Sequence, residues 1–298
     1  MDRILASLHN IASEFEVIFV NDGSSDSSLG VLKSLYDKYD CVSVINLTRN
    51  YGQHNAVLCG LRHARFAITI TIDDDLQNPP EEIEKLIKTL EQGYDVVYGI
   101  PSRQQHGFFR RIASIVVKWA LKTTMNIDFA RYVQPFRAFK TELRKAFAAH
   151  TSPHVSIDVL LSWGTSRFGY CVVHHDVRAT GRSAYGFIKL LNHAFNMIAG
   201  YSIAPLRVAI FFGFAFAAFG FLLLCVVLLS LFIQGDIPRG FPFLASVVLM
   251  FSGVQLLFLG IAGEYIGRMY CRIMDQPPYI EQENWSAKRW SAIDNGHQ

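Results

Sequence analysis

The sequence lacks the closely spaced cysteine pairs that mark structural zinc sites, thiol-redox sites and small disulfide-rich folds. Its five cysteines are scattered along the chain. Scattered cysteines are typical of free thiols in a reducing compartment. No apolar segment opens the chain, so the sequence as given predicts no signal peptide. The cysteines are Cys41, Cys59, Cys171, Cys225 and Cys271.

The ten histidines also lack the spacing of a metal site. His150 and His154 have helical spacing, but Pro153 lies between them and interrupts a helix. His174 and His175 are adjacent on a predicted strand, so their side chains face opposite sides of it. The sequence therefore predicts no metal site built from histidines.

Two phosphate-binding motifs are absent as well. The chain contains neither GxGxxG nor GxxxxGK[ST], which excludes the phosphate loops of the dinucleotide-binding and P-loop folds. The formal net charge is +3, which gives no reason to expect a nucleic-acid partner.

Charge is missing from two long segments, residues 208–233 and 241–263. The apolar core of a bilayer requires about 20 residues, so each segment is long enough to cross it. A short loop joins the two segments. The sequence predicts a hairpin of two transmembrane helices, and the alternative is a pair of buried core helices.

Arginines that flank the two segments predict their orientation. Arg207 precedes the first segment, and Arg268 and Arg272 follow the second. By the positive-inside rule both flanks, and therefore both termini, are expected in the cytoplasm. Residues 107–125 and 183–202 have amphipathic helical patterns, which either lie at the membrane interface or pack on a sheet.

From residue 14 to residue 100 the pattern alternates between strand and helix. Strands are predicted over residues 15–20, 42–47, 68–72 and 95–100, with helical patterns between them. This order is typical of an α/β fold with a mostly parallel sheet, in which ligands bind at the carboxyl ends of the strands.

The third predicted strand ends in a run of three aspartates. Asp73 and Asp75 are two residues apart and point the same way in an extended turn, and Gln77 continues the series. Two carboxylates and an amide oxygen suit Mg²⁺ or Mn²⁺, and substrate phosphates commonly complete the shell of such an ion. The same run is also typical of a solvated acidic turn. These residues alone leave both interpretations open.

Four motifs occur in order along the chain: "VNDGSSDSS" from Val20, "TRNYGQHNA" from Thr48, "IDDDLQNPPEEI" from Ile72 and "GEYIGRMY" from Gly263. Together they resemble the family-2 glycosyltransferases of GT-A fold that act on polyprenyl phosphates, a group that includes the bactoprenol glucosyltransferases. The resemblance extends over about residues 4–281 and is nearest to members with a hairpin of two membrane helices. It says little about which sugar is moved.

The resemblance implies roles for particular residues. Asp22 is expected to contact the donor nucleobase, and Asp73 and Asp75 to form the DxD motif of the donor site. Asp75 is expected to hold Mg²⁺ or Mn²⁺ with Gln77 beside it. Arg137 is expected close to the reacting groups. Four further arginines are candidates for binding the donor or acceptor phosphates: Arg103, Arg110, Arg111 and Arg182.

The resemblance also implies a reaction. A sugar would move with inversion from a nucleotide sugar, expected to be UDP-linked, to undecaprenyl phosphate at the cytoplasmic face of the bacterial inner membrane. The product would serve cell-envelope glycan or lipid modification. Family members usually carry a carboxylate before the segment matching residues 136–139, where this chain has Arg131, Gln134 and Pro135. A phosphate monoester is largely dianionic at neutral pH, so it acts as its own nucleophile without a general base.

The expected organisation is a GT-A domain over residues 1–180, an amphipathic juxtamembrane helix over 181–205, two transmembrane helices over 206–267 and a cytoplasmic tail over 268–298. Family members open with an apolar strand at the centre of the sheet, and the first residues here match the helix after it. We therefore expect a gap in the sheet. The alternatives are a processive polysaccharide synthase and a truncated, non-catalytic relative that binds the membrane or sister subunits. A homo-oligomer is compatible with each.

Overall fold

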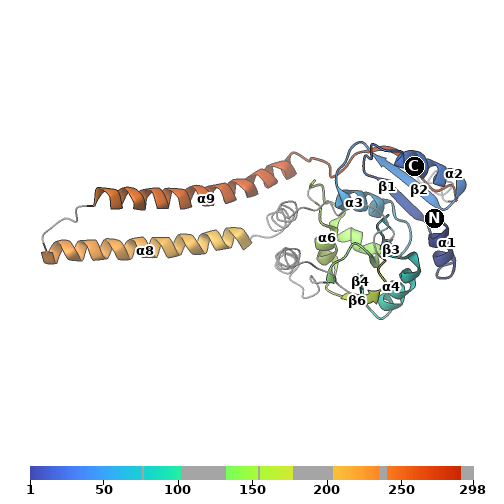
Figure 1. Cartoon of the computed structure of the whole chain (residues 1–298), viewed down its shortest axis with the longest axis horizontal. Coiled ribbons are helices and arrows are strands. Elements are labelled where there is room, and N and C mark those ends of the chain that lie inside the picture. The colour runs from blue at the N-terminus through green and yellow to red at the C-terminus, as the bar shows by residue number, and fades with distance from the viewer. Residues whose placement is uncertain (76, 102–131, 154, 177–203, 235–239, 290–298) are drawn as a thin grey trace.

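The computed structural model describes residues 1–75, 77–101, 132–153, 155–176, 204–234 and 240–289. These residues form an α/β part from which two long helices extend (Figure 1). The α/β class predicted from the sequence is confirmed. The amphipathic segments predicted over 107–125 and 183–202 lie outside the described residues, as does most of the juxtamembrane helix expected over 181–205.

The first sheet has the strand order β1-β2-β7. Strands β1 (Val17–Asn21) and β2 (Val42–Leu47) are parallel and are connected by helix α2 (Ser28–Lys38). Strand β7 (Glu281–Trp285) runs antiparallel to β2, so the chain returns to this sheet after the two long helices. Because β2 pairs on both edges and packs against helix α3 (Gln53–His63), all of its residues are buried. The sequence did not predict β7.

The second sheet has the strand order β3-β5-β4-β6. Strand β5 (Arg137–Lys140) runs antiparallel to both of its neighbours, β3 (Ile68–Thr71) and β4 (Val96–Pro101). Strand β6 (Phe168–Val173) is parallel to β4. Apolar side chains of β4, β5 and β6 form the main core with α3 and with helix α6 (Ile157–Gly164).

The prediction of a mostly parallel sheet is wrong. The described residues form two separate sheets, in which three of the five pairings are antiparallel. The antiparallel pairings arise because β5 and β7 join their sheets from segments outside the regular strand–helix alternation. Strands β1 and β3 each lie at an edge. Ile68 of β3 is 38% exposed, whereas Val44 of β2 and Val97 of β4 are fully buried.

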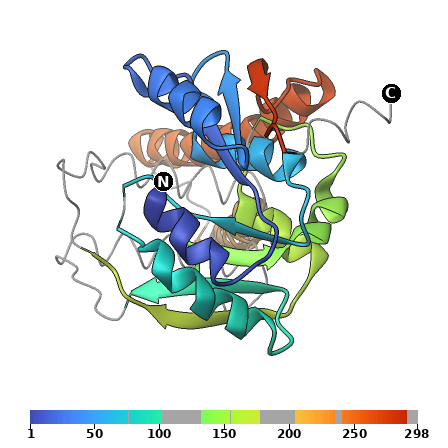
Figure 2. The ribbon, with the colours of Figure 1, turned by 90° about the vertical axis from the view of Figure 1, so that its right-hand side faces the viewer.

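The short helix α1 (Asp2–His9) packs beside η1 (Pro80–Glu82), the turn that leads into helix α4 (Ile83–Leu90) (Figure 2). Arg3 donates two hydrogen bonds of 2.9 Å to the carboxylate of Glu81. Pro80 stands in the first turn of η1, where proline is tolerated because that N–H has no helical partner. The contact between α1 and η1 thereby holds the segment that follows β3, which contains the aspartate run.

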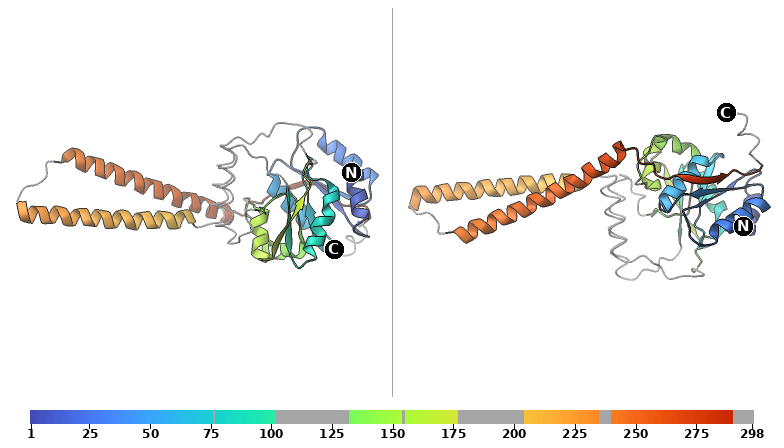
Figure 3. Two further views of the ribbon diagram at one scale, coloured as in Figure 1. Left: turned by 60° about the horizontal axis from the view of Figure 1, so that its bottom comes forward. Right: turned by 90° about the horizontal axis from the view of Figure 1, so that it is seen from above.

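Helices α8 (Ala204–Gln234) and α9 (Phe241–Ile273) lie side by side and extend away from the α/β part (Figures 1 and 3). Both expose large apolar side chains, among them Phe211 and Phe214 on α8 and Leu256 and Leu259 on α9. The predicted hairpin of two transmembrane helices is not confirmed, because within the described part of the chain no helix combines the length and the apolar character that a membrane span requires.

Candidate active site

Asp22 lies in the loop after β1 and holds the loop after β2. Its two carboxylate oxygens accept backbone hydrogen bonds from Tyr51 at 2.7 Å and from Gly52 at 2.8 Å. The next residue, Gly23, has φ +64°, and a Cβ there would lie 2.4 Å from the carbonyl carbon of Arg49. Glycine is required here both for the left-handed backbone and for the close approach of the two loops.

Asp73 and Asp75 follow β3. Gln53, the first residue of α3, donates a hydrogen bond of 2.8 Å to Asp73, so the second and third loops are also connected. Burial raises the pKa of Asp73 above its usual value, and the charge of Asp75 raises it further, with partial compensation by Arg137. Asp75 accepts the backbone N–H of Gln77 at 3.2 Å. The three loops thus form one connected edge at the carboxyl ends of β1, β2 and β3.

A cavity of about 200 Å³ opens beside Asp73. It lies at the carboxyl ends of β3 and β4, where α/β proteins bind ligands. Gly99 lines it closely, because a Cβ there would lie 2.6 Å from the ring of Phe136. His175 and Asn78 close one side, 3.2 Å apart between Nδ1 and Oδ1. The lining consists of Asp73, Gln77, Asn78, Gly99, Pro101, Gln134, Pro135, Phe136 and His175.

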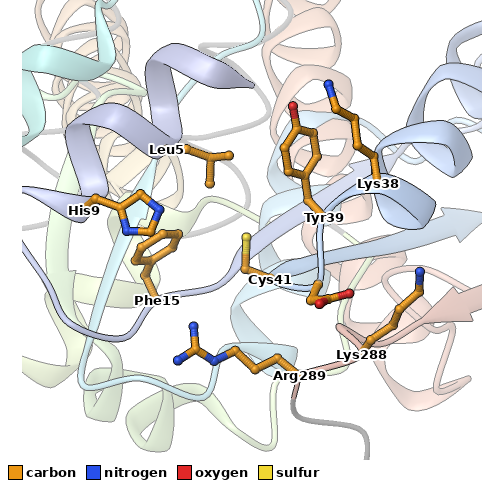
Figure 4. Close-up of a pocket in the computed structure, with 9 residues that line it drawn as sticks. Leu5, His9, Phe15, Lys38, Tyr39, Cys41, Lys288 and Arg289 are labelled. Carbon is orange, nitrogen blue, oxygen red and sulfur yellow. The ribbon is translucent and has the colours of Figure 1, made fainter.

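A second cavity, of about 540 Å³, lies before the first residues of β1 and β2, at the opposite end of these strands (Figure 4). Its wall combines α1, the turn before β2 and the chain after β7. It contains none of the predicted site residues, so its size does not make it the active-site candidate. It is lined by Leu5, His9, Phe15, Lys38, Tyr39, Asp40, Cys41, Lys288 and Arg289.

Arg137 opens β5, directly after Phe136 of the cavity wall, and is 3% exposed. Its guanidinium forms a buried ion pair with Asp158 of α6, and Asp158 also accepts the hydroxyl of Tyr98 at 3.0 Å. Burial disfavours the charged guanidinium, but the Asp158 carboxylate outweighs it and raises the pKa of Arg137. The Nε of Arg137 is buried without a hydrogen-bond partner in the described structure. The positive charge of Arg137 also lowers the pKa of Asp73, which partly offsets the effect of burial.

The structure brings together part of the predicted set. Asp73 and Gln77 line the cavity, and Asp75 is hydrogen-bonded to the backbone of Gln77. Asp22 is joined to them through the loop from Tyr51 to Gln53, and the charge of Arg137 acts on Asp73. The other four predicted arginines, Arg103, Arg110, Arg111 and Arg182, lie outside the described residues.

Sequence reasoning missed Gln53 and Asp158, which contact this set, and His175, which lines the cavity. Asp158 carried a usable signal, because it is the one charged residue of an otherwise largely apolar helix, "IDVLLSWG". A charge in such a segment requires a buried partner. Gln53 and His175 carried no comparable signal, since polar residues in loops and at helix starts are common.

Comparison with known proteins assigns the class of this chain. Residues 1–151 match the family described as glycosyl transferase family 2. Relatives of more than 30% identity match nearly the whole chain. The chain therefore belongs to glycosyl transferase family 2, and it is a glycosyltransferase.

Its relatives include a group of bacterial enzymes with one name. The undecaprenyl-phosphate 4-deoxy-4-formamido-L-arabinose transferase of Shewanella sediminis is 34% identical, over 95% of this chain and 86% of that protein. The protein of the same name from Pseudomonas paraeruginosa is 35% identical, over 93% of this chain and 83% of its own length. The family resemblance inferred from the motifs is thus confirmed.

Among solved structures, the chain is similar to TarS (residues 1–349) of S. aureus in complex with UDP. The identity is 17%, the TM-score is 0.42, and the match covers 67% of this chain and 59% of TarS. Another structure of TarS 1–349 matches with 16% identity and a TM-score of 0.39, over 58% of this chain and 57% of TarS.

Proposed function

We propose that this glycosyltransferase moves a sugar from a nucleotide sugar, expected to be UDP-linked, to undecaprenyl phosphate. The observation that carries the proposal is 34% identity, over 95% of the chain, to a transferase named for undecaprenyl phosphate and a formamido-arabinose. The described site supports it, because a small cavity lined by Asp73 and Gln77 lies at the strand ends, and Asp75 accepts a hydrogen bond from the backbone of Gln77. The lipid-linked product would serve cell-envelope glycan or lipid modification.

The oxygen set beside the cavity fits Mg²⁺ or Mn²⁺. Asp73 and Asp75 are close enough that the charge of Asp75 contributes to the raised pKa of Asp73, and a divalent cation would neutralise this crowding. We assign Asp75 and Gln77 as its ligands, with Asp73 beside them. When bound, the cation would stabilise the negative charge that develops on the departing diphosphate.

The remaining steps are assigned to the chain and the acceptor. An oxygen of the acceptor phosphate bonds to the anomeric carbon while the bond from that carbon to the donor diphosphate breaks, so the configuration inverts. Asp22 positions the loop at Tyr51 and Gly52, which we place beside the nucleobase, and Gln53 orients Asp73. Arg137 is paired with Asp158, and its positive charge also acts on Asp73. Gln134 and Pro135 line the cavity at positions where family members usually carry a carboxylate. A general base is not required there, because the acceptor phosphate is already dianionic.

We also propose that α8 and α9 are embedded in the bacterial inner membrane, with the α/β part and both termini in the cytoplasm. The support is the absence of charge over residues 208–233 and 241–263 and the exposed apolar side chains of both helices. Apolar area left in water costs about 25 cal/mol per Å², so such surfaces require a cover. The proposed acceptor, undecaprenyl phosphate, is a lipid and would lie in the same membrane. A homo-oligomer that covers the helices is the competing arrangement.

The domain limits follow as part of this proposal. A catalytic domain comprises residues 1–180, a juxtamembrane segment 181–205, a membrane unit 206–267 and a cytoplasmic tail 268–298. Helix α9 extends to Ile273, so the tail begins within the last turns of that helix. Because β7 pairs with β2, the tail also contributes a strand to the catalytic domain.

Activity of the full chain in detergent tests the function. The chain would be supplied with UDP-sugars, Mn²⁺ and undecaprenyl phosphate, and the lipid product analysed by mass spectrometry. We expect one sugar per lipid, loss of product with Asp75→Asn, and retention with Asp74→Asn, whose side chain is exposed. A ladder of sugars would identify a processive synthase instead. Absence of any lipid product with every donor offered would overturn the acceptor assignment.

A further inference from the structure

Three side chains of types that can bind a metal ion meet beside α3, and none of them belongs to the predicted site. Cys59 and His63 are four residues apart on α3 and so share one face of the helix. Glu281 opens β7, opposite Leu47 of β2, and reaches the same point. The carboxylate Oε1 of Glu281 lies 2.8 Å from Nε2 of His63 and 3.7 Å from Sγ of Cys59. All three ligand atoms lie within 4.8 Å of one another.

The chemistry of this set differs from that of the aspartate run. Sulfur, imidazole nitrogen and one carboxylate are ligands of Zn²⁺ and similar divalent transition metals, whereas Mg²⁺ prefers oxygen alone. Zinc bonds are about 2.0–2.3 Å long and tetrahedral, so two ligands of one ion lie about 3.3–3.8 Å apart. The 3.7 Å between Glu281 and Cys59 already fits, the 2.8 Å between Glu281 and His63 must open slightly, and all three atoms lie within 4.8 Å of one another.

We propose that Cys59, His63 and Glu281 bind one zinc-type divalent cation that fastens β7 to α3. Three protein ligands leave a fourth position for water. Binding replaces the thiol proton of Cys59 with the metal, so an S–H bond breaks, a metal–sulfur bond forms and one proton passes to solvent. Asn284 donates a hydrogen bond of 3.1 Å to the other carboxylate oxygen of Glu281, which orients that ligand.

The exposure of the three side chains would allow an ion to reach the site from the His63 and Glu281 side. Cys59 is fully buried, while the side chains of His63 and Glu281 are 35% and 28% exposed. Without a cation, the same atoms form a hydrogen-bonded pair of His63 and Glu281, with the Cys59 thiol donating to Glu281. Burial and the neighbouring Glu281 raise the pKa of the Cys59 thiol, so it stays protonated in that state.

The location gives the cation a structural consequence. β7 follows α9 directly along the chain, and α3 begins with Gln53, which holds Asp73 of the candidate active site. A metal between α3 and β7 therefore couples the end of the long helices to the element that positions the site. The sequence contained this signal as a cysteine and a histidine at helical spacing, but the third ligand is 218 positions away from His63.

Cobalt titration of the metal-free full chain in detergent tests the proposal, because a cobalt–thiolate bond gives a near-ultraviolet charge-transfer band. We expect the band to saturate at one Co²⁺ per chain and to disappear when Zn²⁺ is added. Cys59→Ser should abolish it, and His63→Gln should weaken cobalt binding at least tenfold. Cys171→Ser, at a half-buried cysteine of β6, is the matched control and should leave it unchanged.

The outcomes separate this site from the aspartate run. The band should persist in Asp75→Asn, which removes a proposed active-site ligand. Cobalt binding that lacks the band and is lost in Asp75→Asn would overturn the proposal and leave one oxygen site. His63→Gln changes a partly exposed residue and is expected to fold, so it remains informative if Cys59→Ser does not. Zn²⁺ should raise the melting temperature of the unmodified chain more than that of His63→Gln; equal shifts would contradict a metal between α3 and β7.

Discussion

At Asp73, the stability of the fold and the proposed binding of a cation favour different charge states of the carboxyl. Its carboxyl is partly buried beside Asp75, and its pKa is raised mainly by burial and then by that neighbour. A carboxyl whose pKa is higher in the folded than in the unfolded state destabilises the fold as pH rises past the unfolded value, and the penalty persists at neutral pH. The same crowding would suit the divalent cation that we propose, so that stability and cation binding would make opposite demands on this carboxyl.

Asp73→Asn should therefore raise stability and lower function. At neutral pH the amide removes the penalty of ionising a crowded carboxyl, so the melting temperature should rise, and the gain should vanish below about pH 4, near the unfolded pKa. Metal-dependent UDP binding should weaken at the same time. Scanning calorimetry at two pH values measures the first effect. A variant that is less stable at neutral pH would show that the hydrogen bond from Gln53 dominates at this position.

The three consecutive aspartates differ in exposure, and this difference predicts how strongly each Asp→Asn substitution weakens UDP binding. Asp73 and Asp75 are partly buried and Asp74 is exposed. Asp75→Asn should weaken Mn²⁺-dependent UDP binding by more than tenfold, or about 1.4 kcal/mol, because a charged ligand becomes neutral. Asp73→Asn should weaken it less, and Asp74→Asn hardly at all. Isothermal calorimetry with UDP and Mn²⁺ measures the affinity of each variant. Equal losses in all three variants would refute the inference that Asp73 and Asp75 face the cation while Asp74 faces solvent.

The buried pair of Arg137 and Asp158 predicts a large cost when one partner is neutralised. Asp158→Asn leaves the guanidinium buried without a counter-ion, and such changes cost about 3–5 kcal/mol. Glu84→Gln is the matched control, because Glu84 pairs with Lys88 on the surface and exposed pairs contribute about 0–1 kcal/mol. Denaturant unfolding in detergent measures both. Similar losses would mean that Asp73 suffices as the counter-ion of Arg137.

At the scale of elements, the local pattern predicted strands better than it predicted their partners. Alternating and apolar runs located β1, β2, β3 and β4 within a few residues, because the side chains of a strand reflect its two faces. The antiparallel insertion of β5 and the return of β7 depend on pairings between distant segments, which no local window contains. The motifs located the aspartates, whereas Asp158 and Glu281 reach their clusters through tertiary packing.

The edge positions of β1 and β3 predict uneven protection of backbone amides. A strand that pairs on both sides has its N–H groups in the ladder, whereas an edge strand leaves alternate groups open to water. Amides of β2 and β4 should therefore exchange slowly, and those of β1 and β3 considerably faster. Hydrogen–deuterium exchange with mass spectrometry measures this by peptide. Equal protection of β1 and β2 would show that another segment covers the open edge of β1.

At the scale of the whole molecule, the chain connects a charged α/β part to a pair of long helices with apolar surfaces. Composition alone indicated this division, since residues 208–233 and 241–263 lack charge altogether. The return of the chain to β7 was not predictable from composition, and it means that the helices are attached to the α/β part at both ends. If the helices lie in the membrane, as we propose, this double attachment would hold the α/β part close to the membrane surface, where a lipid acceptor is located.

The proposed orientation predicts the accessibility of two engineered cysteines in cells. Gln234 ends α8 and Glu283 is exposed on β7, so the two positions report on opposite ends of the helical pair. In a chain with its native cysteines replaced by serine, Gln234→Cys should react with a membrane-impermeant maleimide in whole cells. Glu283→Cys should react only after lysis, because the arginines at positions 207, 268 and 272 favour a cytoplasmic location for that end. Labelling of Glu283→Cys in intact cells would reverse the orientation, and protection of both cysteines until lysis would mean that the helical pair does not cross the membrane.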